Sequence, residues 1–160
     1  MHKALFLDRD GVINRERGQY TWRKEDFVLT PGIVPFLQAA QARGYLLIVI
    51  TNQGGIAKHA FSDEDLQVVH DYMRTLLARE GIRLTDIYYC PHHDSVSKCL
   101  CRKPGTLMFE KAAAQYGIDP KASLYVGDYD RDEEAGRRAG IPTLRIASNE
   151  DLTPYISMLS

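Results

Sequence analysis

The chain has 160 residues, a length typical of one domain and too short for two full ones. Its 20 Lys and Arg against 21 Asp and Glu give a net charge of -1, which argues against a general nucleic-acid binder because such proteins have a basic excess. The apolar run near the N-terminus is too short for a signal sequence or a membrane span, so we expect a cytoplasmic protein with no membrane partner.

Short apolar runs alternate along the chain with segments of helical periodicity. Strands are predicted at 4–7, 45–50, 86–89, 123–126 and 142–146. Runs that are apolar throughout suit strands buried on both faces, as in parallel sheets. Helices are predicted at 33–40, 62–77, 109–116 and 135–139, with Ser62 as an N-cap and a last short helix at 150–159. The alternation predicts an α/β protein with helices on both faces of a doubly wound sheet.

Carboxylates stand directly after two predicted strands: Asp8 and Asp10 follow the first, and Asp128 follows the fourth. Ligands of open α/β sheets bind at the carboxyl ends of the strands, so we expect these groups to meet there. Because Mg²⁺ takes oxygen ligands, Asp8, Asp10 and Asp128 are predicted to hold it beside a phosphate. Asp132, one helical turn later, would orient Asp128 or water on the metal. The alternative is that acids at 128–134 only stabilise a helix start through its dipole.

Side chains that suit a phosphate are predicted near the same edge. Thr51 and Asn52 end the second strand with a hydroxyl and an amide. Farther along, Lys103 would neutralise phosphate charge, and Arg102 would clamp a second anionic group. Each pair also has an ordinary interpretation. Thr51 and Asn52 could simply open a turn, and Arg102 and Lys103 could be a solvated basic pair. There is no Gly-rich Lys-Ser/Thr loop, which indicates a phosphate on a small substrate rather than on bound ATP.

The three cysteines all fall within residues 90–101, at Cys90, Cys99 and Cys101. An odd number of cysteines so close together is a poor disulfide framework and a good metal site. With His92 they form a complete tetrahedral set for structural Zn²⁺, with no position open to water. His93 is a rival to His92 as the fourth ligand, and an unligated cysteine cluster is the alternative.

In their order along the chain, these motifs resemble those of the haloacid-dehalogenase-like phosphatases. The matching residues are Asp8-Arg9-Asp10-Gly11-Val12, Thr51, Lys103 and Gly127-Asp128 with Asp132. The resemblance spans nearly the whole chain. It implies a Rossmann-like core and Mg²⁺-dependent hydrolysis of phosphate monoesters through an aspartyl-phosphate.

The resemblance also implies roles for the matching residues. Asp8 would be the nucleophile, and Asp10 would be the general acid and then the base, while its backbone carbonyl binds the metal. Thr51 and Lys103 would hold the phosphoryl group, and Asp128 would complete the magnesium site. To protonate the leaving group, Asp10 would need a pKa raised relative to that of metal-bound Asp8.

The cysteine loop narrows the resemblance. Residues 88–93 and 99–104 resemble the zinc loop of D-glycero-D-manno-heptose-1,7-bisphosphate phosphatases, and histidinol-phosphate phosphatases of the same subfamily have a similar loop. In both, this loop shapes the substrate pocket without a chemical role, and in the heptose enzymes the Asn52 and Arg102 positions help to bind substrate. We expect one domain over residues 1–160, with a zinc loop at 90–101 and no large cap.

Two short loops would then select the substrate, residues 15–25 and the loop that carries Arg102. The first contains the basic residues Arg15, Arg17, Arg23 and Lys24. Together with Arg102, they favour a second anionic group on the small phosphorylated metabolite. The leading substrate is therefore D-glycero-D-manno-heptose 1,7-bisphosphate, and the alternative is histidinol phosphate. A distant alternative is a non-catalytic, zinc-stabilised domain that binds phosphosugars. The sequence leaves the oligomeric state open, a monomer included.

Overall fold

Five parallel strands form one sheet in the order β3-β2-β1-β4-β5 in the computed structural model, which describes residues 1–160. The strands are β1 (Ala4–Leu7), β2 (Leu46–Asn52), β3 (Asp86–Cys90), β4 (Leu124–Gly127) and β5 (Thr143–Arg145). The chain adds strands on one side of β1 and then on the other, so the order reverses between β1 and β4. A crevice for ligands opens at such a reversal, beyond the carboxyl ends of the strands.

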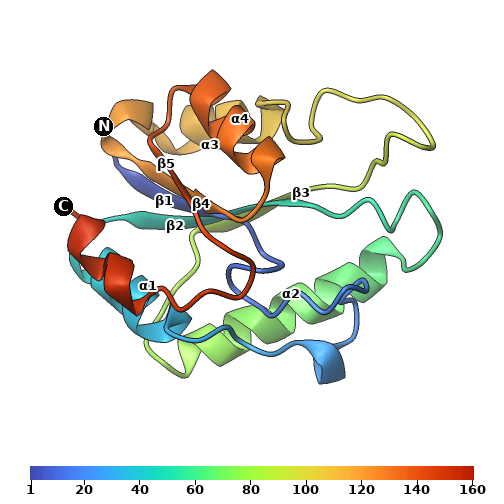
Figure 1. The fold of residues 1–160 in the computed structure, drawn as a ribbon, viewed down its shortest axis with the longest axis horizontal. Coiled ribbons are helices and arrows are strands. Elements are labelled where there is room, and N and C mark those ends of the chain that lie inside the picture. The colour runs from blue at the N-terminus through green and yellow to red at the C-terminus, as the bar shows by residue number, and fades with distance from the viewer.

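Two helices cover each face of the sheet (Figure 1), as predicted. They are α1 (Ile33–Ala42), α2 (Asp63–Ala78), α3 (Leu107–Tyr116) and α4 (Asp130–Ala139). Successive strand side chains point to opposite faces, so Leu5 and Leu7 pack with α1 and α2, whereas Phe6 packs with α3 and α4. The sheet is therefore buried on both sides, which explains why β1 and residues 46–50 of β2 are apolar at every position.

Helix starts follow local hydrogen bonding. The predicted N-cap of α2 is confirmed, because Ser62 Oγ accepts from the Asp65 amide at 3.1 Å and Asp65 returns the bond to the Ser62 amide at 2.9 Å. The prediction for the fourth helix was wrong at its start, because α4 begins at Asp130 rather than at residue 135. Asp132 Oδ2 accepts from the Tyr129 amide at 3.0 Å and so caps the helix earlier.

The remaining helical segments are short 3₁₀ turns, η1 (Lys24–Asp26), η2 (Pro120–Ala122) and η3 (Thr153–Met158). The last of them lies within the segment 150–159, where a short helix was expected, and it is a 3₁₀ turn of six residues. No helix combines the length and the hydropathy that a bilayer crossing requires.

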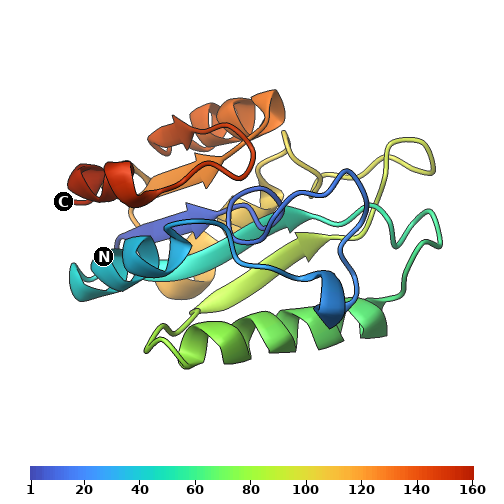
Figure 2. The same ribbon diagram turned by 60° about the horizontal axis from the view of Figure 1, so that its bottom comes forward.

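All strands point the same way, and the loops after β1, β2 and β3 gather beyond their carboxyl ends (Figure 2).

Candidate active site

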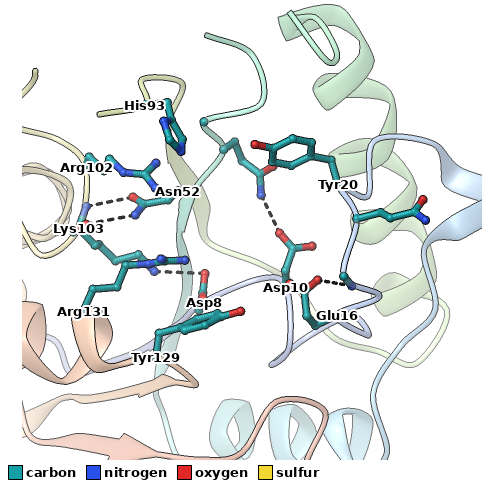
Figure 3. Close-up of a pocket in the computed structure, with 14 residues that line it drawn as sticks. Asp8, Asp10, Glu16, Tyr20, Asn52, His93, Arg102, Lys103, Tyr129 and Arg131 are labelled. Atoms are coloured by element: carbon teal, nitrogen blue, oxygen red, sulfur yellow. Dashed lines mark hydrogen bonds and ion pairs between the residues drawn. The ribbon is translucent and has the colours of Figure 1, made fainter. Parts of the chain in front are cut away.

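A cavity of about 620 Å³ lies at this edge of the sheet (Figure 3). Its lining includes five of the residues singled out from sequence: Asp8, Asp10, Asn52, Arg102 and Lys103. These side chains come from the ends of β1 and β2 and from the loop before α3. The fold thus brings together segments that are up to about a hundred residues apart, as the positions after the strands predict.

Three buried carboxylates meet beside the cavity. Oxygen atoms of Asp8, Asp128 and Asp132 all lie within 4.8 Å of one another. Lys103 Nζ, also buried, lies 3.2 Å from Asp8 Oδ1 and 2.8 Å from Asp132 Oδ1. One ammonium against three carboxylates leaves an excess of negative charge. Burial raises the pKa of Asp8 to about 8. The charge of Lys103 lowers this pKa only in part, and repulsion from Asp132 raises it further.

The cluster fits a divalent cation. Asp128 Oδ1 is buried and has no hydrogen-bond partner, whereas Oδ2 accepts from Ser148 Oγ at 2.6 Å. Such an oxygen, next to the carboxylate of Asp8, is the hard ligand that Mg²⁺ prefers. Gly11 allows the close approach, because a Cβ at this position would lie 2.0 Å from Asp128 Oδ2, and its φ of +85° disfavours other residues.

Asp132 is fully engaged by the chain itself. Oδ1 accepts from Lys103 Nζ at 2.8 Å and from the Tyr125 hydroxyl at 2.6 Å. Oδ2 accepts from the backbone amides of Asp128 and Tyr129 at 3.1 and 3.0 Å. Although burial opposes ionisation, the charge of Lys103 and these bonds lower the pKa of Asp132. Asp132 therefore orients its neighbours, as the sequence suggested, rather than offering a free oxygen.

The Asp10 side chain lies apart from this cluster, because β1 ends at Leu7 and the chain turns away. Its Oδ1 accepts from Arg9 Nη2 at 2.7 Å and from Asn14 Nδ2 at 3.0 Å, and its Oδ2 accepts from Gln53 Nε2 at 3.0 Å. Burial opposes the ionised form, but the Arg9 charge and these bonds lower the pKa of Asp10. The expectation of a raised pKa for Asp10 was stated relative to metal-bound Asp8, and it stays a prediction.

Arg9 links Asp10 to helix α2. Its guanidinium is fully buried, and Nη2 also donates to the Thr21 carbonyl oxygen at 2.7 Å. Nη1 lies 3.3 Å from His70 Nε2 on α2. Because arginine is always a donor, His70 must accept there and is neutral. Burial, together with the Arg9 charge, lowers the pKa of His70 to about 3.

The end of β2 fastens the loop that carries Lys103. Asn52 Oδ1 accepts from the Lys103 amide at 3.0 Å, and its Nδ2 donates to the Lys103 carbonyl at 3.3 Å. The buried Thr51 accepts a bond from Gln53 Nε2 at 3.0 Å, and the same amide group reaches Asp10. Asn52 therefore positions Lys103 in addition to lining the cavity.

The predicted zinc ligands come together in the loop after β3. Four distances between the ligand atoms are 3.3 to 3.6 Å: Cys90 Sγ to His92 Nδ1, Cys90 Sγ to Cys99 Sγ, His92 Nδ1 to Cys101 Sγ, and Cys99 Sγ to Cys101 Sγ. A tetrahedron around Zn²⁺ with Zn–S bonds of about 2.3 Å has edges of about 3.8 Å, so the set needs little adjustment to hold the ion. His93 turns away to Ser95, with Nδ1 2.8 Å from Oγ, which places His92 rather than His93 in the set.

The basic residues of the loop after β1 do not line the cavity, contrary to expectation. From that loop the lining takes Glu16, Gly18, Gln19 and Tyr20 instead. Arg17 and Arg23 are paired with Asp26 at 3.5 and 3.8 Å on the outer side. The loop thus presents polar and aromatic groups to a ligand, and two of its basic side chains pair with its own Asp26.

Sequence reasoning gave no role to several residues that shape the site: Arg9, Gln53, Tyr129, Arg131 and Ser148. Four of them are next to predicted site residues in the chain, and this position could have identified them: Arg9, Gln53, Tyr129 and Arg131. Ser148 lies in the loop after β5, and no local pattern marks it.

Comparison with known proteins agrees with this geometry. Residues 100–153 match the family model described as HAD-hydrolase-like. The chain is 44% identical over 146 residues to the D-glycero-alpha-D-manno-heptose-1,7-bisphosphate 7-phosphatase of Photorhabdus laumondii, covering 88% of this chain and 79% of that one. It is 39% identical over 159 residues to the corresponding beta-anomer enzyme of Pasteurella multocida, covering 96% and 86%.

A solved structure shows the same fold. The crystal structure of D,D-heptose 1,7-bisphosphate phosphatase from B. bronchiseptica, complexed with magnesium and phosphate, superimposes with a TM-score of 0.83 at 31% identity, covering 88% of this chain and 78% of that one. With these identities over most of both chains, the protein is an enzyme that belongs to the haloacid-dehalogenase-like phosphatases.

Proposed function

We propose that this enzyme hydrolyses D-glycero-D-manno-heptose 1,7-bisphosphate, removing the phosphate at position 7. One observation carries the proposal: the buried Asp8–Lys103 pair stands beside the unpartnered Asp128 oxygen in a chain 39–44% identical to enzymes of that name. Because these relatives act on different anomers, we propose no anomer preference. The cytoplasmic location stays a prediction.

Asp8 would act as the nucleophile. Its carboxylate attacks phosphorus, the ester bond to the sugar oxygen breaks, and an aspartyl-phosphate forms; water then attacks phosphorus and releases inorganic phosphate and Asp8. Lys103, 3.2 Å away, relieves the repulsion between this carboxylate and the phosphate, and Thr51 would donate to a phosphoryl oxygen. Mg²⁺ held by Asp8, Asp128 and the Asp10 backbone carbonyl would neutralise charge on the transferring group.

Asp10 would act as the general acid and then as the general base. It would give one to the leaving sugar oxygen and later take one from the attacking water. The bonds from Arg9, Asn14 and Gln53 favour its ionised form, which suits the second step. For the first step, the negative charge of the arriving phosphate would raise the pKa of Asp10.

The test is phosphate release with Mg²⁺ from both anomers of heptose 1,7-bisphosphate, from histidinol phosphate and from simple sugar phosphates. We expect the heptose ester to have the highest kcat/KM. A preference for histidinol phosphate would overturn the substrate proposal and leave the chemistry in place.

The nucleophile is tested by Asp8→Asn, with Asp130→Asn as a matched control because Asp130 is exposed at the start of α4. We expect Asp8→Asn to lose kcat by at least about 10³-fold, since the amide cannot form the phospho-intermediate. Substrate labelled with ³²P at position 7 and acid-quenched should label wild-type Asp8. Full activity in Asp8→Asn would show that the nucleophile is another residue.

A further inference from the structure

Two of the three cationic side chains that line the cavity are already bound by the chain. Lys103 forms ion pairs of 3.2 and 2.8 Å with Asp8 and Asp132. Arg102 donates from Nη1 to the His92 carbonyl oxygen at 3.1 Å, and its Nε has a carboxylate at 3.7 Å. Their charges are thus compensated, at least in part, by the protein.

Arg131, the third cation, has no such partner. It lies in the first turn of α4, half-buried, with no carboxylate within 4.0 Å, and its buried Nε makes no hydrogen bond. In Figure 3 its side chain extends from α4 toward the part of the cavity near Asp8 and Asn52. A partly desolvated charge without a counter-ion is costly, so a ligand anion at this place would be stabilised.

The neighbouring Tyr129 holds Arg131 in a defined orientation. The guanidinium carbon lies 4.5 Å from the centroid of the Tyr129 ring, within the range of cation–π contacts. Stacking uses the flat face of the guanidinium and leaves its in-plane N–H groups free for bidentate contacts. Because the side chain is partly fixed in advance, less rotamer entropy is lost when an anion binds.

We propose that Arg131 binds the second phosphate of a doubly phosphorylated substrate, the group that is not transferred. The inference rests on the proposed function, in which Asp8 and Lys103 take the phosphate that leaves. The cavity of about 620 Å³ is of the size that holds a small ligand. Arg131 thus supplies the positive charge that the loop after β1 was expected to supply and does not.

The experiment compares two substrates that share the reacting phosphate. Heptose 1,7-bisphosphate and heptose 7-phosphate are assayed with the wild type, Arg131→Gln, Arg131→Lys and Arg137→Gln. The last is a matched control on the same helix, with a side chain that is 78% exposed and outside the cavity. The quantity measured is the ratio of kcat/KM for the bisphosphate to kcat/KM for the monophosphate.

We expect Arg131→Gln to lower this ratio about 10- to 100-fold, mostly through KM, as for the loss of a charge-assisted bond. Arg131→Lys should keep part of the preference, and Arg137→Gln should match the wild type. Equal losses on both substrates would leave the ratio unchanged and overturn the inference, because they would place Arg131 at the transferred phosphate or in a purely structural role. No loss on either substrate would overturn it as well.

Failure of the proposed function has a different signature. A wild-type enzyme that releases no phosphate from either heptose ester would overturn the proposed substrate, and this inference with it. Hydrolysis of both esters with no dependence on Arg131 would overturn this inference alone.

Discussion

Lys103 is the residue on which the buried carboxylate cluster depends. Its ammonium reaches Asp8, Asp132 and the Tyr125 hydroxyl, the last two at 2.8 Å. Three carboxylates within 4.8 Å would otherwise repel one another strongly in a site with little water. Asp132 is the one of the three with both oxygens fully bonded by the chain, and we infer that it sets the position of Lys103.

Replacing Asp132 by Asn should therefore impair catalysis. An amide has one acceptor oxygen, so either Lys103 or the two backbone amides lose their partner. We expect kcat to fall about 10- to 100-fold while the protein stays folded at the assay temperature, as for the loss of charge-assisted bonds. Steady-state kinetics and thermal unfolding are measured together. The control is Asp130→Asn, two residues away and exposed; equal kinetics in the two variants would contradict the positioning role.

Among the elements, the loop between β3 and α3 connects the predicted zinc site to the candidate active site. Cys101, the last of the four predicted zinc ligands, precedes Lys103 by two residues, and Asn52 at the end of β2 holds the Lys103 backbone from the other side. The Arg102 amide also donates to Cys99 Sγ at 3.4 Å. Zinc would therefore act on the chemistry indirectly, by keeping this loop in one conformation.

Loss of zinc should loosen the loop and lower activity. We expect Cys99→Ser to reduce zinc content well below about one ion per chain and to increase proteolysis after Lys98. We also expect kcat/KM to fall at least about tenfold, because Lys103 loses its support. Metal analysis, limited proteolysis and kinetics are the measurements. Ser97→Ala changes an exposed side chain of the same loop and should behave as the wild type. Full activity in zinc-free protein would show that the loop needs no metal.

At the scale of the whole molecule, α2 is joined to the catalytic loop through a buried neutral histidine. His70 faces Arg9, Asp10 and Arg74, and its ring also packs against Tyr89 of β3 at 6.1 Å between centroids. Since the pKa of His70 is lowered to about 3 from 6.5, the unfolded chain binds a proton that the folded protein does not. The contribution to stability is full above pH 6.5 and is lost as the pH falls toward 3.

His70→Gln should remove this part of the acid sensitivity. In the wild type, the histidine should lower the free energy of unfolding by up to about 1.4 kcal/mol for each unit of pH below 6.5. Urea unfolding at pH 6.5 and 5 measures the difference, before most carboxylates titrate. Between pH 6.5 and 5, we expect the free energy of unfolding to fall less in His70→Gln than in the wild type. The control His2→Gln, which alters an exposed residue, should show the same fall as the wild type. The same decrease in all three proteins would show that His70 is not neutral and buried.

The sequence by itself determined the parallel sheet, the helices on both its faces and most of the residues that meet at the candidate active site. Fully apolar runs can only be buried on both sides, and polar groups directly after such strands must meet at one edge. The predicted zinc set followed from composition, because three cysteines and a histidine within twelve residues supply the four ligands of a structural site.

Only the tertiary structure decided contacts between distant segments. It separated the Asp10 carboxylate from the cluster of Asp8 and Asp128, and it surrounded this carboxylate with Arg9, Asn14 and Gln53, which lower its pKa. It also left the cations of the loop after β1 out of the cavity lining and placed Arg131 in it. Such features depend on burial and on neighbours across the fold, since a charge has no preferred partner until the chain has packed around it.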